Sequence, residues 1–401
     1  MIRYASSWRA VPLDEALRRA SAIAPEFGIS RVTDITRLDR LGVPVFASVR
    51  PGAATGSLCV NAGKGLTSDE ARVGALMEAI EFAFGEVRFA TVQRVLATAR
   101  EVLAHDARFS IVDLCPLAGA KIYLDEPMEC VVAEDLDGEK TLVPAELVFF
   151  PFPLPPGKTL FQASTNGLAS GSTQTEATLH GLFEAIERDA ASFDAVLPRS
   201  LAVRESSLPE AHADVVMRIR RQGLDMALRW IPNDFDIACV HAVVWERAML
   251  DPIFMTEGYG CHLDPNIALT RAMTEAVQGR LSFIHGGRDD IQDRHHDFSG
   301  WPRARKRVYA HTLVQRARRQ TEAFDLREAI DWSDGAQSLE DLLARVRCRL
   351  HDAGLSRILR VEMTPPGSPV AVVRVIVPGL EYFSPRQPRV GPRLAAFVND
   401  A

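Results

Sequence analysis

The sequence lacks the cysteine spacing that holds zinc knuckles and small secreted domains together. Its six cysteines are scattered, with no C-x-x-C pair, so we expect reduced thiols and neither a zinc site nor a disulfide framework. No apolar run approaches the length of a membrane-spanning helix, and the amino end has no apolar signal segment. With 46 Lys and Arg against 52 Asp and Glu, the net charge is −6, which argues against unspecific binding to nucleic acid or anionic membranes. These absences predict a cytoplasmic globular protein.

Two common nucleotide-binding motifs are also missing. Neither the P-loop pattern G-x-x-x-x-G-K-[ST] nor a full G-x-G-x-x-G occurs, so the sequence supports neither a P-loop ATPase nor a dinucleotide fold. What is present is a mixture of helical and strand patterns over 401 residues, enough for one large or two ordinary domains. Apolar periodicity predicts helices at 13–24 and 338–353 and strands at 43–49, 226–230, 238–245 and 370–377.

Three further predicted helices share one pattern. They start after glycine-bearing segments, at Thr67, Thr173 and Asp264. Each threonine is followed by Glu at the third position, a capping-box pattern, and Asp264 precedes Pro265 at the favoured first helical position. The fourth, eighth and twelfth residues after each start are Ala or Gly, so each helix has a stripe that lets another element approach closely. This repetition indicates a duplicated unit within one compact body.

A second stripe on the same helices is acidic. The third, seventh, eleventh and fourteenth positions fall on one helical face. The last two of these carry a carboxylate or its amide: Glu78 and Glu81, Glu184 and Glu187, Glu275 and Gln278. A single Glu-x-x-Glu usually lies on a solvated face, but here the other faces are apolar, which predicts buried helices. Clustered carboxylates need cations between them, and oxygen ligands favour Mg²⁺, which usually binds with phosphates.

Glycines precede each of these helices, in residues 61–65, 166–171 and 258–260. We expect them to form turns, the first being a Gly-rich turn at 63–65. A helix N-terminus that follows such a turn favours anions, because its free N–H groups and the helix dipole point outward.

Taken together, the segments resemble the signature motifs of the YcaO family. The first motif is GKG at 63–65 with EAIE at 78–81, the second is STNGLASG at 164–171 with EAIERD at 184–189, and the third runs from GYGCH at 258–262 to 271–280. The resemblance covers residues 1–290, with the motifs in order. It implies an α+β YcaO fold, with mixed sheets and packed helices built from a pseudo-repeated unit and Mg-ATP held between the Glu-bearing helices.

The resemblance implies ATP-dependent O-phosphorylation of a peptide backbone amide, and it assigns roles to individual residues. Mg²⁺ ligands would be Glu78, Glu81, Glu184 and Glu187. Nucleotide contacts would be Arg9, Asn166, Glu176, Arg188, Glu275, Gln278 and Arg280. Glu187 and Arg188 are expected to act in catalysis at the transferred phosphoryl group. Two positions depart from the family pattern: Gly74 stands where Ser is frequent, and Ala16 replaces a polar residue, so each removes one expected phosphate contact.

The nucleophile decides the product. A Cys, Ser or Thr side chain of the substrate would give an azoline ring, and external sulfide would give a thioamide. Azoline-forming relatives typically end in Pro-x-Pro-x-Pro, whereas this sequence ends in PRLAAFVNDA. Segments 287–290, 377–381 and 389–393 are similar to members that work with a TfuA-type partner. We therefore expect thioamide formation on a peptide or protein substrate, supported by a TfuA-like protein that delivers sulfur.

Three other functions stay open: an azoline-forming cyclodehydratase, a non-catalytic scaffold that assists modification of a ribosomal protein, and an unrelated Mg²⁺ hydrolase of free nucleotides. The intact glutamates count against the scaffold.

Basic clusters at 218–221, 303–307 and 316–319 are expected to be solvated faces or to hold a leader peptide or an acidic partner. The resemblance further implies a homodimer. Within each chain we expect residues 1–62 to be the N-terminal part, 63–290 the ATP-binding core and 291–401 the C-terminal part of the same compact body.

Overall fold

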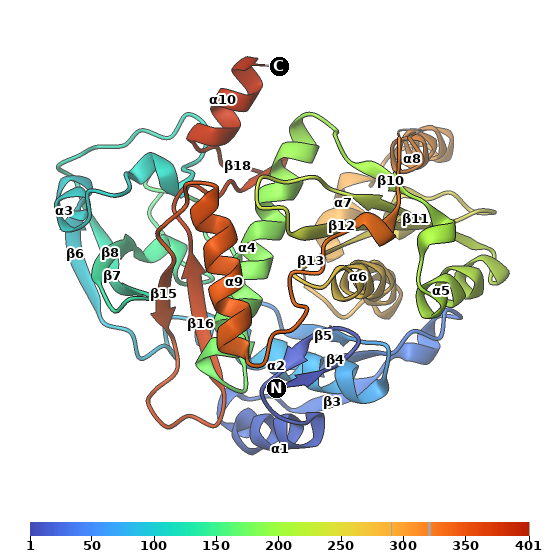
Figure 1. Cartoon of the computed structure of the whole chain (residues 1–401), viewed down its shortest axis with the longest axis horizontal. Coiled ribbons are helices and arrows are strands. Elements are labelled where there is room, and N and C mark those ends of the chain that lie inside the picture. Colours follow the sequence, from blue (N-terminus) through green and yellow to red (C-terminus); the bar gives the residue numbers. More distant parts are fainter. Residues whose placement is uncertain (290, 320–321, 401) are drawn as a thin grey trace.

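Three long helices form the centre of the computed structural model, which describes residues 1–289, 291–319 and 322–400, without the side chains of residues 292 and 293. They are α2 (Ser68–Gly85), α4 (Gln174–Val196) and α6 (Pro265–His285). Figure 1 shows α4 standing between two larger sheets, with α2 and α6 beside it. No helix in the described part of the chain is long and apolar enough to cross a membrane.

Two larger sheets and a small one pack around these helices. The five-stranded sheet has the order β13 (Thr256–His262), β12 (Ala238–Glu246), β11 (Leu224–Trp230), β10 (Leu201–Val203) and β14 (Ala323–Phe324). The six-stranded sheet has the order β6 (Arg94–Thr98), β7 (Pro127–Asp135), β15 (Leu359–Glu362), β16 (Ala371–Ile376) and β9 (Leu168–Gly171), with β8 (Lys140–Pro144) paired to β7. The small sheet contains β3 (Arg31–Asp34), β4 (Val45–Val49) and β5 (Val60–Lys64).

Shorter elements complete the chain. Strand pairs join β1 (Ile2–Arg3) to β2 (Trp8–Arg9) and β17 (Phe383–Ser384) to β18 (Gln387–Pro388). The remaining helices are α1 (Leu13–Ile23), α3 (Ala99–His105), α5 (Glu210–Arg221), α7 (Ile291–Asp297), α8 (Arg303–Ala317), α9 (Leu339–Asp352) and α10 (Pro392–Asp400). The elements predicted from periodicity are therefore confirmed, with bounds shifted by one or two residues. The expected part boundary at 62/63 lies inside β5, and β15 and β16 place C-terminal residues inside the six-stranded sheet.

The repeated unit is a strand followed at once by a helix: β5 and α2, β9 and α4, β13 and α6. Thr67, Thr173 and Asp264 are the N-caps, as predicted. The reciprocal capping box forms at Thr67, but only half of it forms at Thr173. There the Glu176 carboxylate instead accepts hydrogen bonds from Arg9 Nη1 at 2.9 Å and Ala10 N at 3.0 Å.

The prediction that the glycine segments are turns is confirmed at residues 166–167, where Gly167 lies in a turn with a φ of 76°, but it is wrong for four other glycines, which lie within strands. Gly63 is in β5, Gly171 in β9, and Gly258 and Gly260 in β13. A Cβ added to Gly63 would lie 2.0 Å from the Ala75 backbone nitrogen, and one added to Gly260 would lie 2.0 Å from a backbone oxygen of α6. The glycines thus match the small-residue stripes, and each strand lies directly on the backbone of the helix that follows it.

Candidate functional site

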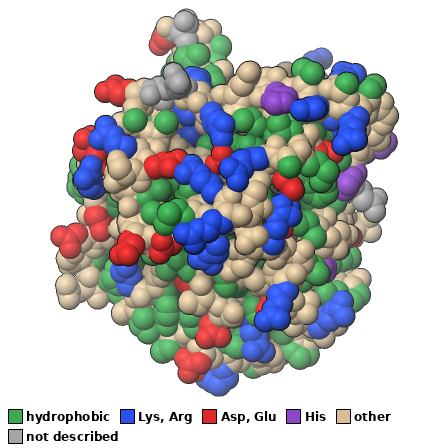
Figure 2. All heavy atoms as spheres, turned by 90° about the vertical axis from the view of Figure 1, so that its right-hand side faces the viewer, with side chains coloured by type: hydrophobic (Ala, Val, Ile, Leu, Met, Phe, Trp, Pro, Cys, Tyr) green, Lys and Arg blue, Asp and Glu red, His purple; other side chains and the backbone are tan. Residues whose placement is uncertain are grey.

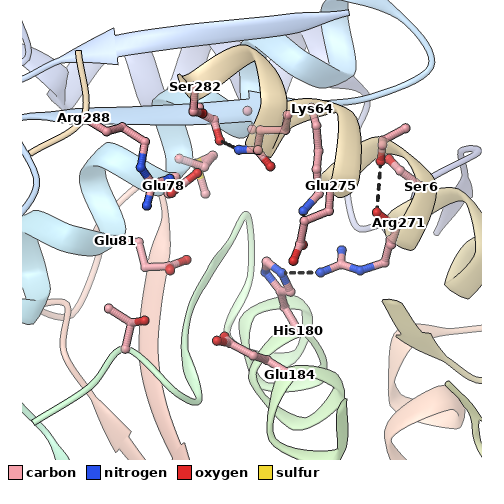
Figure 3. A pocket seen from close by; sticks show the side chains of 18 of the residues that line it. Ser6, Lys64, Glu78, Glu81, His180, Glu184, Arg271, Glu275, Ser282 and Arg288 are labelled. Carbon is pink, nitrogen blue, oxygen red and sulfur yellow. Dashed lines mark hydrogen bonds and ion pairs between the residues drawn. The ribbon is translucent and has the colours of Figure 1, made fainter. Parts of the chain in front are cut away.

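The acidic faces of α2, α4 and α6 converge on one cavity of about 490 Å³, as Figure 3 shows. Of the residues predicted to share these faces, the following line it: Glu70, Gly74, Glu78 and Glu81 from α2, His180, Glu184 and Glu187 from α4, and Arg271, Glu275 and Gln278 from α6. The close strand-to-helix packing in each repeat holds the three faces in place. The helical periodicity in the sequence therefore corresponds to a real three-sided site.

Burial in this cavity disfavours the ionised form of several carboxylates. Burial raises the pKa of Glu81 well above its usual range, and the neighbouring carboxylates Glu184 and Glu78 add to the effect. Burial also raises the pKa of Glu187, to about 7, while Arg188 opposes the shift. The Glu81 carboxylate accepts a hydrogen bond from Ser170 Oγ at 3.0 Å. A site of this kind favours protons or added cations.

The donor set fits Mg²⁺ bound together with phosphates. Among the residues the structure describes, no three His, Cys, Asp or Glu side chains are grouped closely enough to hold an ion by themselves. Mg²⁺ commonly uses one or two carboxylates, several waters and phosphate oxygens, so a closed protein cage is not required. At Gly74, a Cβ would make ordinary van der Waals contact with the backbone of β5, 3.4 Å from the Gly63 Cα, so a small side chain would fit at this position. Carboxylate oxygens around an open cavity therefore suit the metal and a phosphate ligand.

Basic side chains from several elements face the same cavity. Lys64, at the end of β5, forms an ion pair with Glu275. Arg188 lies 3.7 Å from the Glu187 carboxylate, and although burial opposes it, the surrounding carboxylates raise the pKa of Arg188. Arg9 also lines the cavity. These cations are placed where polyanionic phosphates would need them.

Sequence reasoning assigned no function to several other lining residues, including Lys64, Arg271, Arg288 and Arg294. Lys64 lay in the GKG motif and Arg271 on the predicted face of α6, so both had a signal. Arg288 lay in the segment 287–290 that the sequence analysis singled out, but its place at the cavity, like that of Arg294, follows from tertiary structure. Burial, together with Arg271 and Arg9, lowers the pKa of His180 well below its usual range, so the neutral ring can accept a hydrogen bond from Arg271 Nη2 at 3.1 Å.

Three of the predicted nucleotide contacts are not in the cavity lining. Glu176 anchors Arg9, as described above, and lines a small neighbouring hollow. The Asn166 side-chain oxygen is buried without a hydrogen-bond partner, and Thr165 lines the cavity beside it. Arg280 points elsewhere, donating from Nε to Asp39 Oδ2 at 2.8 Å. The structure thus brings Arg9, Arg188, Glu275 and Gln278 to the cavity and leaves Arg280 in a structural ion pair.

The two departures from the family pattern have different surroundings. Gly74 lines the cavity, whereas Ala16 is 5% exposed and belongs to the apolar core around α1 and α2. Of the segment 287–290, Arg288 lines the cavity, Asp289 accepts a hydrogen bond from Cys59 N at 2.7 Å, and Asp290 lies outside the described residues.

The sequence matches known proteins over most of its length. A family model described as YcaO cyclodehydratase, ATP- and Mg²⁺-binding, matches residues 62–381. An uncharacterized protein of Methanothermobacter thermautotrophicus is 35% identical over 97% of this chain and 99% of its own length. An uncharacterized protein in the tfuA 3′ region of Rhizobium leguminosarum bv. trifolii is 33% identical over 90% of this chain and 86% of its own.

Solved structures show the same fold. YcaO from Methanopyrus kandleri bound with AMPPCP and Mg²⁺ matches with a TM-score of 0.76 and 23% identity, covering 98% of both chains. A heterocyclase in complex with substrate and cofactor matches with a TM-score of 0.73 and 22% identity, over 96% of this chain and 54% of its own. The α+β fold expected from the motifs is confirmed.

Proposed function

The chain belongs to the YcaO family of ATP-dependent, Mg²⁺-binding enzymes, and we propose that it converts a peptide backbone amide into a thioamide with the help of a TfuA-like partner. The observation that supports amide activation is the meeting of three acidic helix faces and several cations in one cavity. The residues proposed to hold Mg²⁺ are Glu78, Glu81, Glu184 and Glu187. Arg9, Lys64, Arg188 and Glu275 are proposed to hold the nucleotide.

The proposed chemistry overcomes the low reactivity of an amide. ATP, when bound, supplies the phosphoryl group that is added to the amide oxygen. Arg188 would neutralise negative charge that develops during transfer, and the proposed carboxylates would hold the Mg²⁺ that adds to this neutralisation. Sulfide then adds to the amide carbon, and the original oxygen leaves with the phosphate. One sulfur replaces one oxygen, while ATP becomes ADP and phosphate, so no oxidant or reductant is needed.

Sulfur delivery by a separate protein is supported by one relative. The Rhizobium protein that is 33% identical to this chain is named for its position in a tfuA 3′ region. A TfuA-like protein encoded beside this chain would be the first partner to test. A homodimer is part of the same proposal, and light scattering of the purified protein measures it.

The test combines enzyme, TfuA-like partner, ATP, Mg²⁺, sulfide and a candidate peptide whose amide oxygen is isotopically labelled. Exchange of oxygen for sulfur in the peptide, with the label recovered in phosphate, supports the proposal. A peptide that loses one water instead supports the second candidate, an azoline-forming cyclodehydratase, which the family description favours. ATP turnover that needs no peptide would indicate a nucleotide hydrolase, and peptide-dependent binding without modification would indicate a scaffold.

A further inference from the structure

Helix α8 carries an unusual charge distribution outside the cavity. From residue 298 to residue 319 the sequence contains seven Lys and Arg and no Asp or Glu. Four of these cations lie in the first turns of α8: Arg303, Arg305, Lys306 and Arg307. A helix N-terminus is its positive end, so cations there are unfavourable for the isolated helix. The helix dipole therefore does not favour the cluster.

The neighbours of α8 divide these cations into two groups. At the far end, Arg318 pairs with Asp225, and Arg319 Nη1 donates to Pro198 O at 2.6 Å, so both serve the fold. In contrast, no described carboxylate forms an ion pair with Arg303, Lys306 or Arg307. Asp297, the acid before the segment, is already paired with Arg386. The first turns of α8 therefore present uncompensated positive charge.

Apolar side chains accompany this charge. Val308 is 68% exposed and Tyr309 is 40% exposed, next to the cations. Phe298, Trp301 and Tyr309 pack their rings against one another with centroids 5.4 to 5.7 Å apart, and Arg305 lies 3.9 Å above the Trp301 ring. This cluster gives the surface a fixed shape that a flexible basic tail would not have.

The surface is connected to the cavity by α7. Ile291 and Arg294 of α7 line the cavity wall, and Arg294 Nη2 is fixed by the Pro252 carbonyl at 2.6 Å. The aromatic cluster follows α7 in the chain, before α8 begins. Figure 1 places α8 at the outer side of the five-stranded sheet, and Figure 2 shows groups of Lys and Arg on that side of the molecule. A peptide bound on α8 would therefore be held on the segment that directly follows α7, the helix that contributes to the cavity wall.

We propose that the surface formed by Arg303, Arg305, Lys306, Arg307, Val308 and Tyr309 binds an acidic segment of the peptide substrate and holds that substrate near the cavity. The inference rests on the proposed peptide substrate and adds its recognition element. Carboxylates pair with the cations, and apolar side chains of the peptide pack on Val308 and Tyr309. A protein of net charge −6 with apolar groups among its cations suits an acidic peptide better than a nucleic acid.

The test measures binding in the absence of ATP, sulfide and partner, so its outcome is separate from that of the thioamide assay. The probe is a fluorescent synthetic peptide of alternating Glu and Leu, compared with the same peptide carrying Gln for Glu. We expect binding of the Glu peptide to weaken with salt and to fall roughly tenfold in the variant Arg303→Gln/Lys306→Gln/Arg307→Gln.

A matched control removes three exposed arginines outside α8, in the variant Arg72→Gln/Arg218→Gln/Arg221→Gln. This control should bind the Glu peptide as the unchanged protein does. Both variants should keep their melting temperature and basal ATP turnover. Equal binding of the Glu and Gln peptides, equal weakening in both variants, or tighter binding of a single-stranded RNA that depends on the same α8 residues would each overturn the proposal.

Discussion

Arg393 donates a hydrogen bond from Nη1 to Oδ1 of Asp189 over 2.6 Å, which joins the C-terminal segment to the central helix α4. Asp189 is 1% exposed and directly follows Glu187 and Arg188, two residues that line the cavity. The same carboxylate oxygen accepts a hydrogen bond from Glu381 N at 2.7 Å. The segment that resembled TfuA-associated members in sequence therefore holds the helical turn that carries two proposed site residues.

Replacing Arg393 should affect both stability and activity. In Arg393→Gln the buried Asp189 loses its cation, which should lower the free energy of unfolding by about 3 kcal/mol. Because α4 is then less well held, ATP turnover should fall in kcat more than in KM. Denaturant unfolding and steady-state kinetics measure these effects.

The double variant Arg393→Gln/Asp189→Asn should recover part of the lost stability, since it removes the buried charge as well as its partner. Arg386→Gln is the matched control, because Arg386 forms an exposed pair with Asp297. A loss of stability in Arg386→Gln as large as in Arg393→Gln would contradict the special role of the buried pair.

Glu184→Gln should lower Mg²⁺-dependent ATP turnover by roughly a hundredfold, because a neutral amide is a poor Mg²⁺ ligand. Folding should be preserved, since the substitution removes a buried charge whose pKa burial already raises. Glu210→Gln, at an exposed position on α5, is the control. Unchanged turnover in Glu184→Gln would remove this residue from the proposed metal site.

The raised pKa of Glu187 predicts two opposite pH effects. The folded pKa of about 7 lies above the ordinary value of 4.5. The stability that this carboxyl contributes to the metal-free protein is therefore fully present below pH 4.5. That contribution is lost as pH rises through about 7. Binding of Mg²⁺ with AMPPCP needs the ionised form, so its affinity should instead fall as pH falls through about 7.

Thermal unfolding without metal and calorimetric titration with Mg-AMPPCP measure these two effects. Glu187→Gln should flatten both pH profiles, because its side chain does not titrate. A wild-type affinity for Mg-AMPPCP that is the same on both sides of neutral pH would show that Glu187 does not control binding.

Gly63→Ala tests the strand-to-helix contact of the first repeat. The added Cβ would lie 2.0 Å from the Ala75 nitrogen, so β5 must move away from α2. We expect a loss of roughly 2 kcal/mol or more in the free energy of unfolding and weaker nucleotide binding, since Lys64 is adjacent. Gly52→Ala, where an added Cβ meets nothing within 4 Å, should stay within about 0.5 kcal/mol of the unchanged protein. Equal effects would show that the close approach is unimportant.

Local patterns in the sequence were sufficient for much of this structure. The N-caps Thr67, Thr173 and Asp264 could be located because capping depends on neighbours in the chain. The acidic faces could be identified because helical periodicity alone decides which residues share a face. The glycine motifs were located correctly, but a turn forms only at Gly167 among the glycines compared above, while Gly63, Gly171, Gly258 and Gly260 lie in strands, because glycine is equally typical of turns and of close backbone contacts.

Long-range packing decided the rest. Only the folded chain shows that α2, α4 and α6 turn their acidic faces toward one cavity, that Arg288 and Arg294 reach its wall, and that Arg280 turns away to pair with Asp39. The fold also brings Arg393 to Asp189, which lies 204 positions earlier in the sequence. Helical periodicity and capping are local properties that the sequence carries by itself, whereas the meeting of distant charges depends on how sheets and helices pack, which no local pattern encodes.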